Sequence, residues 1–153
     1  MTAPHLGPGH AVAGKYTVRS LLGFSGEVAT YHAASTQGGD VVVKLYDPAI
    51  GQRADVMGAL ERVRTQVAQT QSAAMLRHID AGYDGGTGAP FVVTEYLRIP
   101  SLAQLAANGP LSPEVVALVM MGVSAALDAA RATELHHHAL KPSNIFVGPA
   151  PGY

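Results

Sequence analysis

The feature that most constrains the fold is the segment Val41–Tyr46, which opens with three consecutive valines. A run of β-branched residues favours a β-strand, because branched side chains pack well on a pleated surface. Two segments before it, Lys15–Gly23 and Phe24–Ala33, also have the composition of strands, and the short loop Gln37–Asp40 carries two glycines. Strands joined by turns this short pair in an antiparallel manner. The first third of the chain therefore predicts antiparallel hairpins.

The middle of the chain adds one helix and two strands. The loop Asp47–Gly58 reads as a linker, and Ala59–Gln69 has apolar residues at 60, 63 and 67, which is a helical spacing. Met75–Tyr83 and Ala89–Leu97 read as strands on either side of a glycine-rich turn. Together these patterns predict an α+β fold with a five-stranded antiparallel sheet and one helix.

Two more helices are predicted towards the C-terminus. Ser101–Gly109 begins with a capping Ser and ends with Gly, and Ser112 followed by Pro113 opens a helix that runs to about Leu135. This helix is apolar nearly all round, so most of its faces must be covered. Its apolar stretch is shorter than the roughly 20 residues that cross a bilayer, so an interaction surface for a protein partner or a second copy is predicted instead. The predicted interaction residues are Val116, Val119, Met120, Val123 and Leu127.

Composition excludes several classes of function. The net charge is −1 with 14% charged residues and no basic run, which gives nucleic acid or an anionic membrane no electrostatic attraction. Cysteine is absent, so there is neither a disulfide nor a thiolate metal site. Residues 1–13 lack the features of a signal peptide and are predicted to be a disordered leader, which favours a cytoplasmic protein.

The segment Leu135–Val147 resembles the catalytic loop of Hanks-type Ser/Thr protein kinases, H-R-D-L-K-P-x-N. In that motif the Asp accepts the proton of the substrate hydroxyl and the Asn holds magnesium. Ala139 stands at the position of the catalytic Asp and His138 at that of the Arg. The remaining motif positions match directly, at His137, Leu140, Lys141, Pro142 and Asn144. The resemblance therefore implies the frame of the loop without its base, with Lys141 and Asn144 as vestigial residues.

The resemblance extends over roughly residues 14–147. It implies a kinase-like N-lobe and hinge at 14–97 and a partial C-lobe at 98–153, truncated before the D-F-G element. Val41–Lys44 stands where the family has V-A-I-K, with Thr94 as gatekeeper. The implied nucleotide residues are Gly23, Gly26, Lys44, Glu95 and Leu97. The αC Glu that pairs with the lysine falls near Val63, and Glu61 lies about 200° around the helix from that position.

These departures imply a pseudokinase that is not an enzyme and acts as an interaction or regulatory module. The first alternative is a regulatory module that binds ATP weakly and without magnesium, because the hinge backbone is retained. The second is the N-terminal part of an active Ser/Thr kinase. A metal site at His136, His137 and His138 is disfavoured, because three consecutive residues do not converge easily on one ion. No metal and no cofactor beyond weakly bound ATP are expected.

Overall fold

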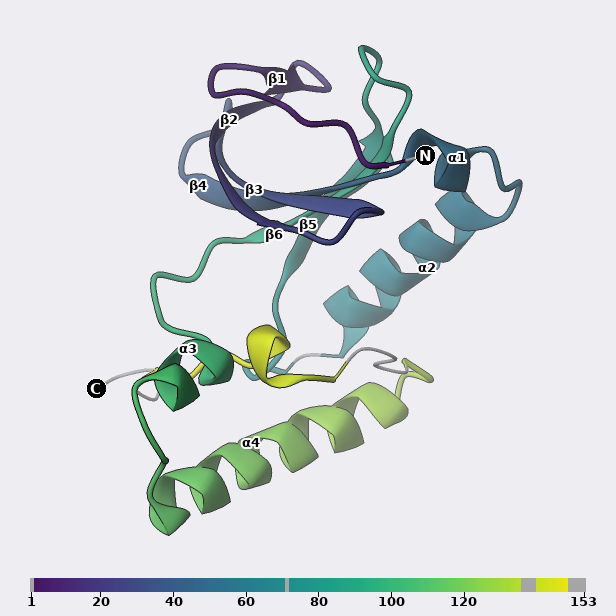
Figure 1. Cartoon of the computed structure of the whole chain (residues 1–153). Helices are drawn as coiled ribbons and strands as arrows, with labels where there is room; N and C mark the ends of the chain where they lie inside the picture. The colour runs from purple at the N-terminus through teal and green to yellow at the C-terminus, as the bar shows by residue number, and fades with distance from the viewer. Residues whose placement is uncertain (1, 71, 136–139, 149–153) are drawn as a thin grey trace. The chain divides into compact units, whose positions relative to one another are not determined.

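The computed structural model describes residues 2–70, 72–135 and 140–148 (Figure 1). The chain divides into two compact units, Met1–Ala68 with Leu76–Tyr96, and Gln69–Met75 with Leu97–Tyr153. The first unit contains a six-stranded antiparallel sheet in the order β1-β2-β3-β4-β6-β5. Its strands are β1 Ala11–Val12, β2 Tyr16–Phe24, β3 Val28–Ser35, β4 Asp40–Tyr46, β5 His78–Tyr83 and β6 Pro90–Glu95. The α+β class is confirmed. The sheet has six strands and not the predicted five, because the short strand β1 was not predicted.

Alternation along the central strands builds the core of the first unit. In β3 and β4 every second side chain is buried, starting at Ala29 and Val41, because successive side chains of a strand point to opposite faces of the sheet. The three-valine run thus contributes two residues to the core and one to the other face. The buried apolar cluster consists of Ala3, Val12, Tyr16, Val18, Ala29, Tyr31, Ala33, Val41, Val43, Leu45, Ala89, Phe91 and Val93.

The N-terminal segment is packed against the sheet, so the prediction of a disordered leader was wrong for residues 2–13. Ala3 and Val12 belong to the core. The fully buried Tyr31 donates its hydroxyl proton to the carbonyl of Pro4 at 3.0 Å and accepts the N–H of Leu6 at 2.9 Å. The contacts span 25 and 27 residues of sequence, which is why local composition did not predict them.

The region expected to be a linker is also helical in part. Asp47 accepts the N–H of Ala49 at 2.8 Å and caps the short helix α1, Pro48–Gly51. The cap followed by Pro at the first helical position is a local start signal that the sequence interpretation overlooked. Helix α2, Val56–Gln69, begins before the predicted Ala59 and contains no buried residue.

The second unit contains α3 (Leu102–Ala107), α4 (Pro113–Arg131) and the 3₁₀ turn η1 (Pro142–Asn144). Ser101 and Gln104 form a reciprocal capping box at α3. The Ser112 hydroxyl accepts the N–H of Val115 at 3.3 Å, as the sequence predicts for the start of α4. Helix α4 ends at Arg131 rather than near Leu135, because the chain turns away through Glu134, whose φ is +57°.

Candidate functional site

The face of the sheet opposite the core carries the predicted lysine. Lys44 pairs with Thr30 on β3 and with Val92 on β6, and Val42 pairs with His32 and Thr94. Residues paired across neighbouring strands share one face of a sheet. The predicted phosphate-contacting lysine and the predicted gatekeeper Thr94 are therefore on one surface, with Val42 where the family motif has Ala.

Lys44 acts electrostatically on His78, the first residue of β5. Burial lowers the pKa of His78, and the charge of Lys44 lowers it further. Glu61, the nearest acidic residue to the predicted αC position, contacts Arg64 on its own helix, with Nε to Oε2 at 3.0 Å. The guanidinium of Arg64 lowers the pKa of this exposed carboxyl.

The two glycines predicted to contact phosphate, Gly23 and Gly26, differ in backbone conformation. Gly26 has a φ of +79°, a conformation that side-chain-bearing residues rarely adopt. Gly23 lies inside β2 opposite Thr30, and a Cβ added to it would meet nothing within 4 Å. Of these two positions, only that of Gly26 has a backbone conformation that favours glycine. The carbonyl of Gly26 accepts the N–H of Ala3 at 2.8 Å.

The predicted hinge begins at the end of β6. The N–H of Glu95 donates to the carbonyl of Arg77 at 3.0 Å, and its carboxylate accepts the N–H of Arg77 at 2.8 Å. Tyr96 stacks on His32 with ring centroids 4.3 Å apart and an angle of 11°. This stack fixes the start of the hinge against β3 and was not predicted, because the two rings are far apart in sequence. Leu97 belongs to the second unit.

The loop that resembles a catalytic loop also belongs to the second unit. Ala139, His136, His137 and His138 lie outside the described residues. After them, Lys141 is exposed and precedes η1, where the N–H of Asn144 donates to the Lys141 carbonyl at 2.9 Å. Within the described ranges, no group of three or more His, Cys, Asp or Glu side chains could hold a metal ion.

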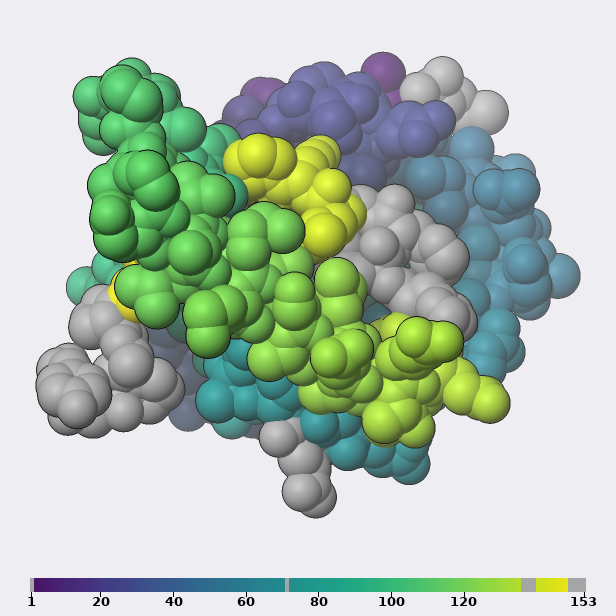
Figure 2. All heavy atoms as spheres, turned by 90° about the horizontal axis from the view of Figure 1, so that it is seen from below, coloured from purple at the N-terminus to yellow at the C-terminus, as the bar shows by residue number. Residues whose placement is uncertain are grey.

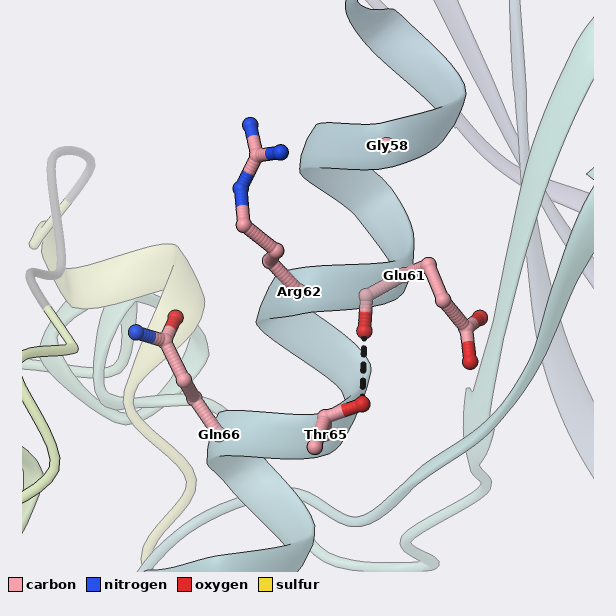
Figure 3. Close-up of a pocket in the computed structure, with 5 residues that line it drawn as sticks. All are labelled: Gly58, Glu61, Arg62, Thr65 and Gln66. Carbon is pink, nitrogen blue, oxygen red and sulfur yellow. Dashed lines mark hydrogen bonds between the residues drawn. The ribbon is translucent and has the colours of Figure 1, made fainter.

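Two surface hollows lie away from the residues predicted to bind nucleotide. The first, of about 330 Å³, is lined by α2 residues alone, Gly58, Glu61, Arg62, Thr65 and Gln66 (Figure 3). The dashed line in Figure 3 marks the hydrogen bond that the Thr65 hydroxyl donates to the Glu61 carbonyl at 3.0 Å. These five residues recur at helical spacing along one side of α2 and contain no pair arranged for acid–base chemistry.

The second hollow, of about 420 Å³, is polar and contains Lys15, Tyr16 and Asp80 among its lining residues. The Tyr16 hydroxyl donates to Asp80 at 2.7 Å. Burial raises the pKa of Tyr16, and the bond to Asp80 raises it further. The tyrosine therefore remains a hydrogen-bond donor over the whole physiological pH range.

Comparison with known proteins identifies the fold. No protein-family model matches the chain. The kinase domain of PknI from Mycobacterium tuberculosis superposes with a TM-score of 0.79 at 24% identity, over 93% of this chain and 57% of that domain. A second structure of the same domain gives 0.77 at 24% identity, over 94% and 59%. At this identity the likeness establishes the fold alone.

Curated relatives extend the comparison to sequence. The probable Ser/Thr kinase SCO3848 of Streptomyces coelicolor is 29% identical over 146 residues. PknD of Mycobacterium tuberculosis is 33% identical over 138 residues, and PrkC of Bacillus subtilis is 28% identical over 145. These matches cover 88–91% of this chain but only 20–22% of the relatives.

The sheet, the helices that follow it and the superpositions define a protein-kinase-like α+β fold, in which the antiparallel sheet matches that of a kinase N-lobe. Its homologues are bacterial Hanks-type Ser/Thr kinases.

Proposed function

We propose that this kinase-like domain transfers no phosphate and acts as a protein-interaction or regulatory module. The observation that carries the proposal is Ala139, which stands where the kinase loop has its general base, directly before the matching Leu140–Asn144. Alanine has neither a lone pair nor a titratable proton, so it cannot accept the proton of a Ser or Thr hydroxyl. The loss of a positioned base alone slows such a reaction by about 10²- to 10⁴-fold.

The test is transfer of labelled phosphate from ATP with magnesium to a generic protein substrate. The full chain is expected to give no incorporation above that of Lys44→Ala. Incorporation that Lys44→Ala abolishes would overturn the proposal, and a further loss in His138→Ala would assign the base to that imidazole. The same signal would favour the alternative of an active Ser/Thr kinase. Ala139→Asp serves as a comparison, because it restores the carboxylate and leaves the rest of the loop unchanged.

A second candidate function is regulatory nucleotide binding. The surface that carries Lys44 and Thr94 supports it, since a cation next to a neutral His78 suits a phosphate. The chain has a single turn glycine with positive φ at Gly26 between β2 and β3, so its backbone can approach phosphates less closely than a three-glycine loop. We expect weak ATP binding that is indifferent to magnesium.

Calorimetry with ATP, in magnesium and in EDTA, tests this second function. Lys44→Ala should abolish the binding heat, whereas Lys15→Ala, which removes the same charge from the polar second hollow, should leave it unchanged. Micromolar or tighter affinity that disappears in EDTA would contradict the expectation of a magnesium-independent site.

The interaction function also has a location. We place the partner surface on α4, and we expect a cytoplasmic protein with neither nucleic acid nor lipid as ligand. The support for this location is the exposure of α4. Among the five predicted residues, Val116, Met120 and Leu127 are exposed. Val119 and Val123 are half-buried and are thus less available to a partner.

A further inference from the structure

Residues 3–6 form a strap that contacts the turn between β2 and β3. The Ala3 N–H donates to the carbonyl of Gly26 at 2.8 Å. The rings of His5 and Phe24 meet edge-on, with their centroids 5.9 Å apart. In Figure 1 the purple N-terminal segment runs along the sheet to β1. The strap therefore touches the turn through one backbone hydrogen bond and one ring contact, both outside the hydrogen-bond ladder of the sheet.

A few contacts anchor the strap in the first unit. Ala3 is buried in the core and Leu6 packs against it. The Tyr31 hydroxyl donates to the carbonyl of Pro4 and accepts the N–H of Leu6. Residues 3–6 belong to neither a helix nor a strand. A segment held by so few contacts opens at a lower free energy than the sheet beneath it, so the strap can leave while the sheet stays folded.

The strap fixes the orientation of the peptide group between Gly26 and Glu27. In a planar trans peptide the N–H points opposite to the carbonyl, so the Glu27 N–H is directed away from the strap. The Glu27 carbonyl accepts the N–H of Asp47 at 2.8 Å, and the Ser25 N–H donates to the Val28 carbonyl at 3.0 Å. Of these three bonds at the turn, only the one from the strap can be released without opening β3 or β4.

The orientation of the turn bears on the face of the sheet that carries Lys44. The strap lies on the core side, because Ala3 and Tyr31 belong to the buried cluster. Lys44 is on the opposite face, since its neighbours in β4 are buried and it is not. The Glu27 N–H is therefore directed to the side of Lys44. The strands that carry the turn appear as blue-purple spheres at the surface in Figure 2, and Ser25 and Glu27 are exposed, so a ligand can reach the turn.

We propose that the strap is a regulatory device for the turn. When docked, it holds the Glu27 N–H in position to donate to a phosphate group on the Lys44 face; when released, it leaves the turn mobile and this donor unaligned. A protein that binds residues 3–6 thus weakens nucleotide binding without touching Lys44. Linkage is reciprocal, so a bound phosphate also stabilises the docked strap. The regulatory effect rests on the second candidate function, nucleotide binding, whereas the coupling of strap and turn does not.

Amide hydrogen exchange of the full chain, followed by NMR, tests the coupling. Ala3→Pro removes the N–H that donates to Gly26 and keeps the rest of the strap. The amides of residues 25–28 should exchange at least about tenfold faster, which corresponds to the loss of one hydrogen bond, while those of residues 37–40 in the next hairpin turn keep their rates. Thr2→Pro, a proline at the exposed neighbouring residue, is the control and should leave both turns unchanged. Unchanged exchange in Ala3→Pro, or equal acceleration in both turns, would overturn the coupling.

A second variant keeps this test decisive. His5→Ala removes the ring contact with Phe24 and alters no buried residue. It should accelerate exchange at the turn in the same direction, and circular dichroism checks that each variant is folded. If Ala3→Pro does not fold, unchanged exchange in His5→Ala would overturn the coupling.

Calorimetry with ATP tests the regulatory effect. Ala3→Pro should bind ATP about tenfold more weakly than wild type, as expected when one hydrogen bond to a charged group is lost. ATP should also slow exchange of the strap amides in wild type. Equal affinities, or strap amides that do not respond to ATP, would overturn the regulatory role. A wild type that binds no ATP would refute nucleotide binding together with its regulation, while faster exchange in Ala3→Pro would still establish the coupling of strap and turn.

Discussion

Asp84 provides the sharpest test of how the N-terminal segment is held. Its side chain is 2% exposed. One carboxylate oxygen accepts the N–H of Ala13 at 2.9 Å, and the other accepts the N–H and the hydroxyl of Thr87 at 3.0 and 2.7 Å. Burial by itself would raise the pKa of Asp84, but these hydrogen bonds outweigh burial and lower it below its ordinary value.

Replacement by Asn keeps the shape and one acceptor oxygen. If the amide oxygen stays on the side of Thr87, the amide nitrogen faces the N–H of Ala13, so one charge-assisted bond is lost and two donors oppose each other. We expect Asp84→Asn to lower the free energy of unfolding by about 2 to 4 kcal/mol near neutral pH. Urea denaturation followed by circular dichroism measures it. The exposed Asp55→Asn is the matched control and should change stability by less than about 0.5 kcal/mol.

The pH dependence gives an independent check of the same bonds. Because the pKa of Asp84 is depressed in the folded state, its stabilisation is fully present above the ordinary pKa of 3.8 and is lost as the pH falls from there through the lower pKa of the folded protein. The difference between wild type and Asp84→Asn should therefore shrink below about pH 4. A difference that is absent at neutral pH, or that remains constant into acid, would refute the reasoning.

Two further substitutions test the packing. Tyr31→Phe removes a fully buried hydroxyl with two backbone partners and should lower the free energy of unfolding by about 1 to 3 kcal/mol in the same urea assay. Tyr83→Phe, at an exposed ring, should lower it by less. Equal losses would contradict the packed N-terminus. A Cβ at Gly51 would lie 2.7 Å from Tyr83 Cε1, so Gly51→Ala should destabilise by about 1 to 3 kcal/mol. A Cβ at Gly58 would lie 3.4 Å from the nearest atom, on the side chain of Arg62, so Gly58→Ala in helix α2 should stabilise the protein by about 0.5 to 1 kcal/mol. If Gly51→Ala were instead the more stable variant, the contact at Gly51 would relax freely.

Local patterns were sufficient for much of the fold. The β-branched run in Val41–Tyr46 predicted a strand, and Ser101 and Ser112 marked two helix starts, because strand composition and helix caps depend on neighbouring residues alone. The packed N-terminus was beyond this reasoning. Its anchors, Tyr31 and Asp84, lie far along the chain, and a segment rich in Gly and Pro gives no local sign of such partners.

The candidate site shows the same division. The spacing of Lys44 and Thr94 in a kinase-like pattern placed both on strands, and the pairing through Val42 brings them to one face. The position of the αC Glu, near Val63, could only be estimated by counting, since helix α2 follows a connection of variable length. The stack of Tyr96 on His32 was not predictable, because ring contacts between strands depend on register and on side-chain direction together.

The retained loop frame has a structural explanation that does not require phosphate transfer. Directly after η1, Ile145 accepts the N–H of Leu102, Phe146 pairs with Ser101 and the Val147 N–H donates to Pro100 at 3.0 Å. These bonds fix the residues that cap α3, and α3 packs against η1. Pro142 opens η1, so a loop of this sequence is needed to close the second unit. The bonds at 145–147 would hold the second unit together whether or not a chain transfers phosphate, so the retention of Leu140–Asn144 is not by itself a sign of catalysis.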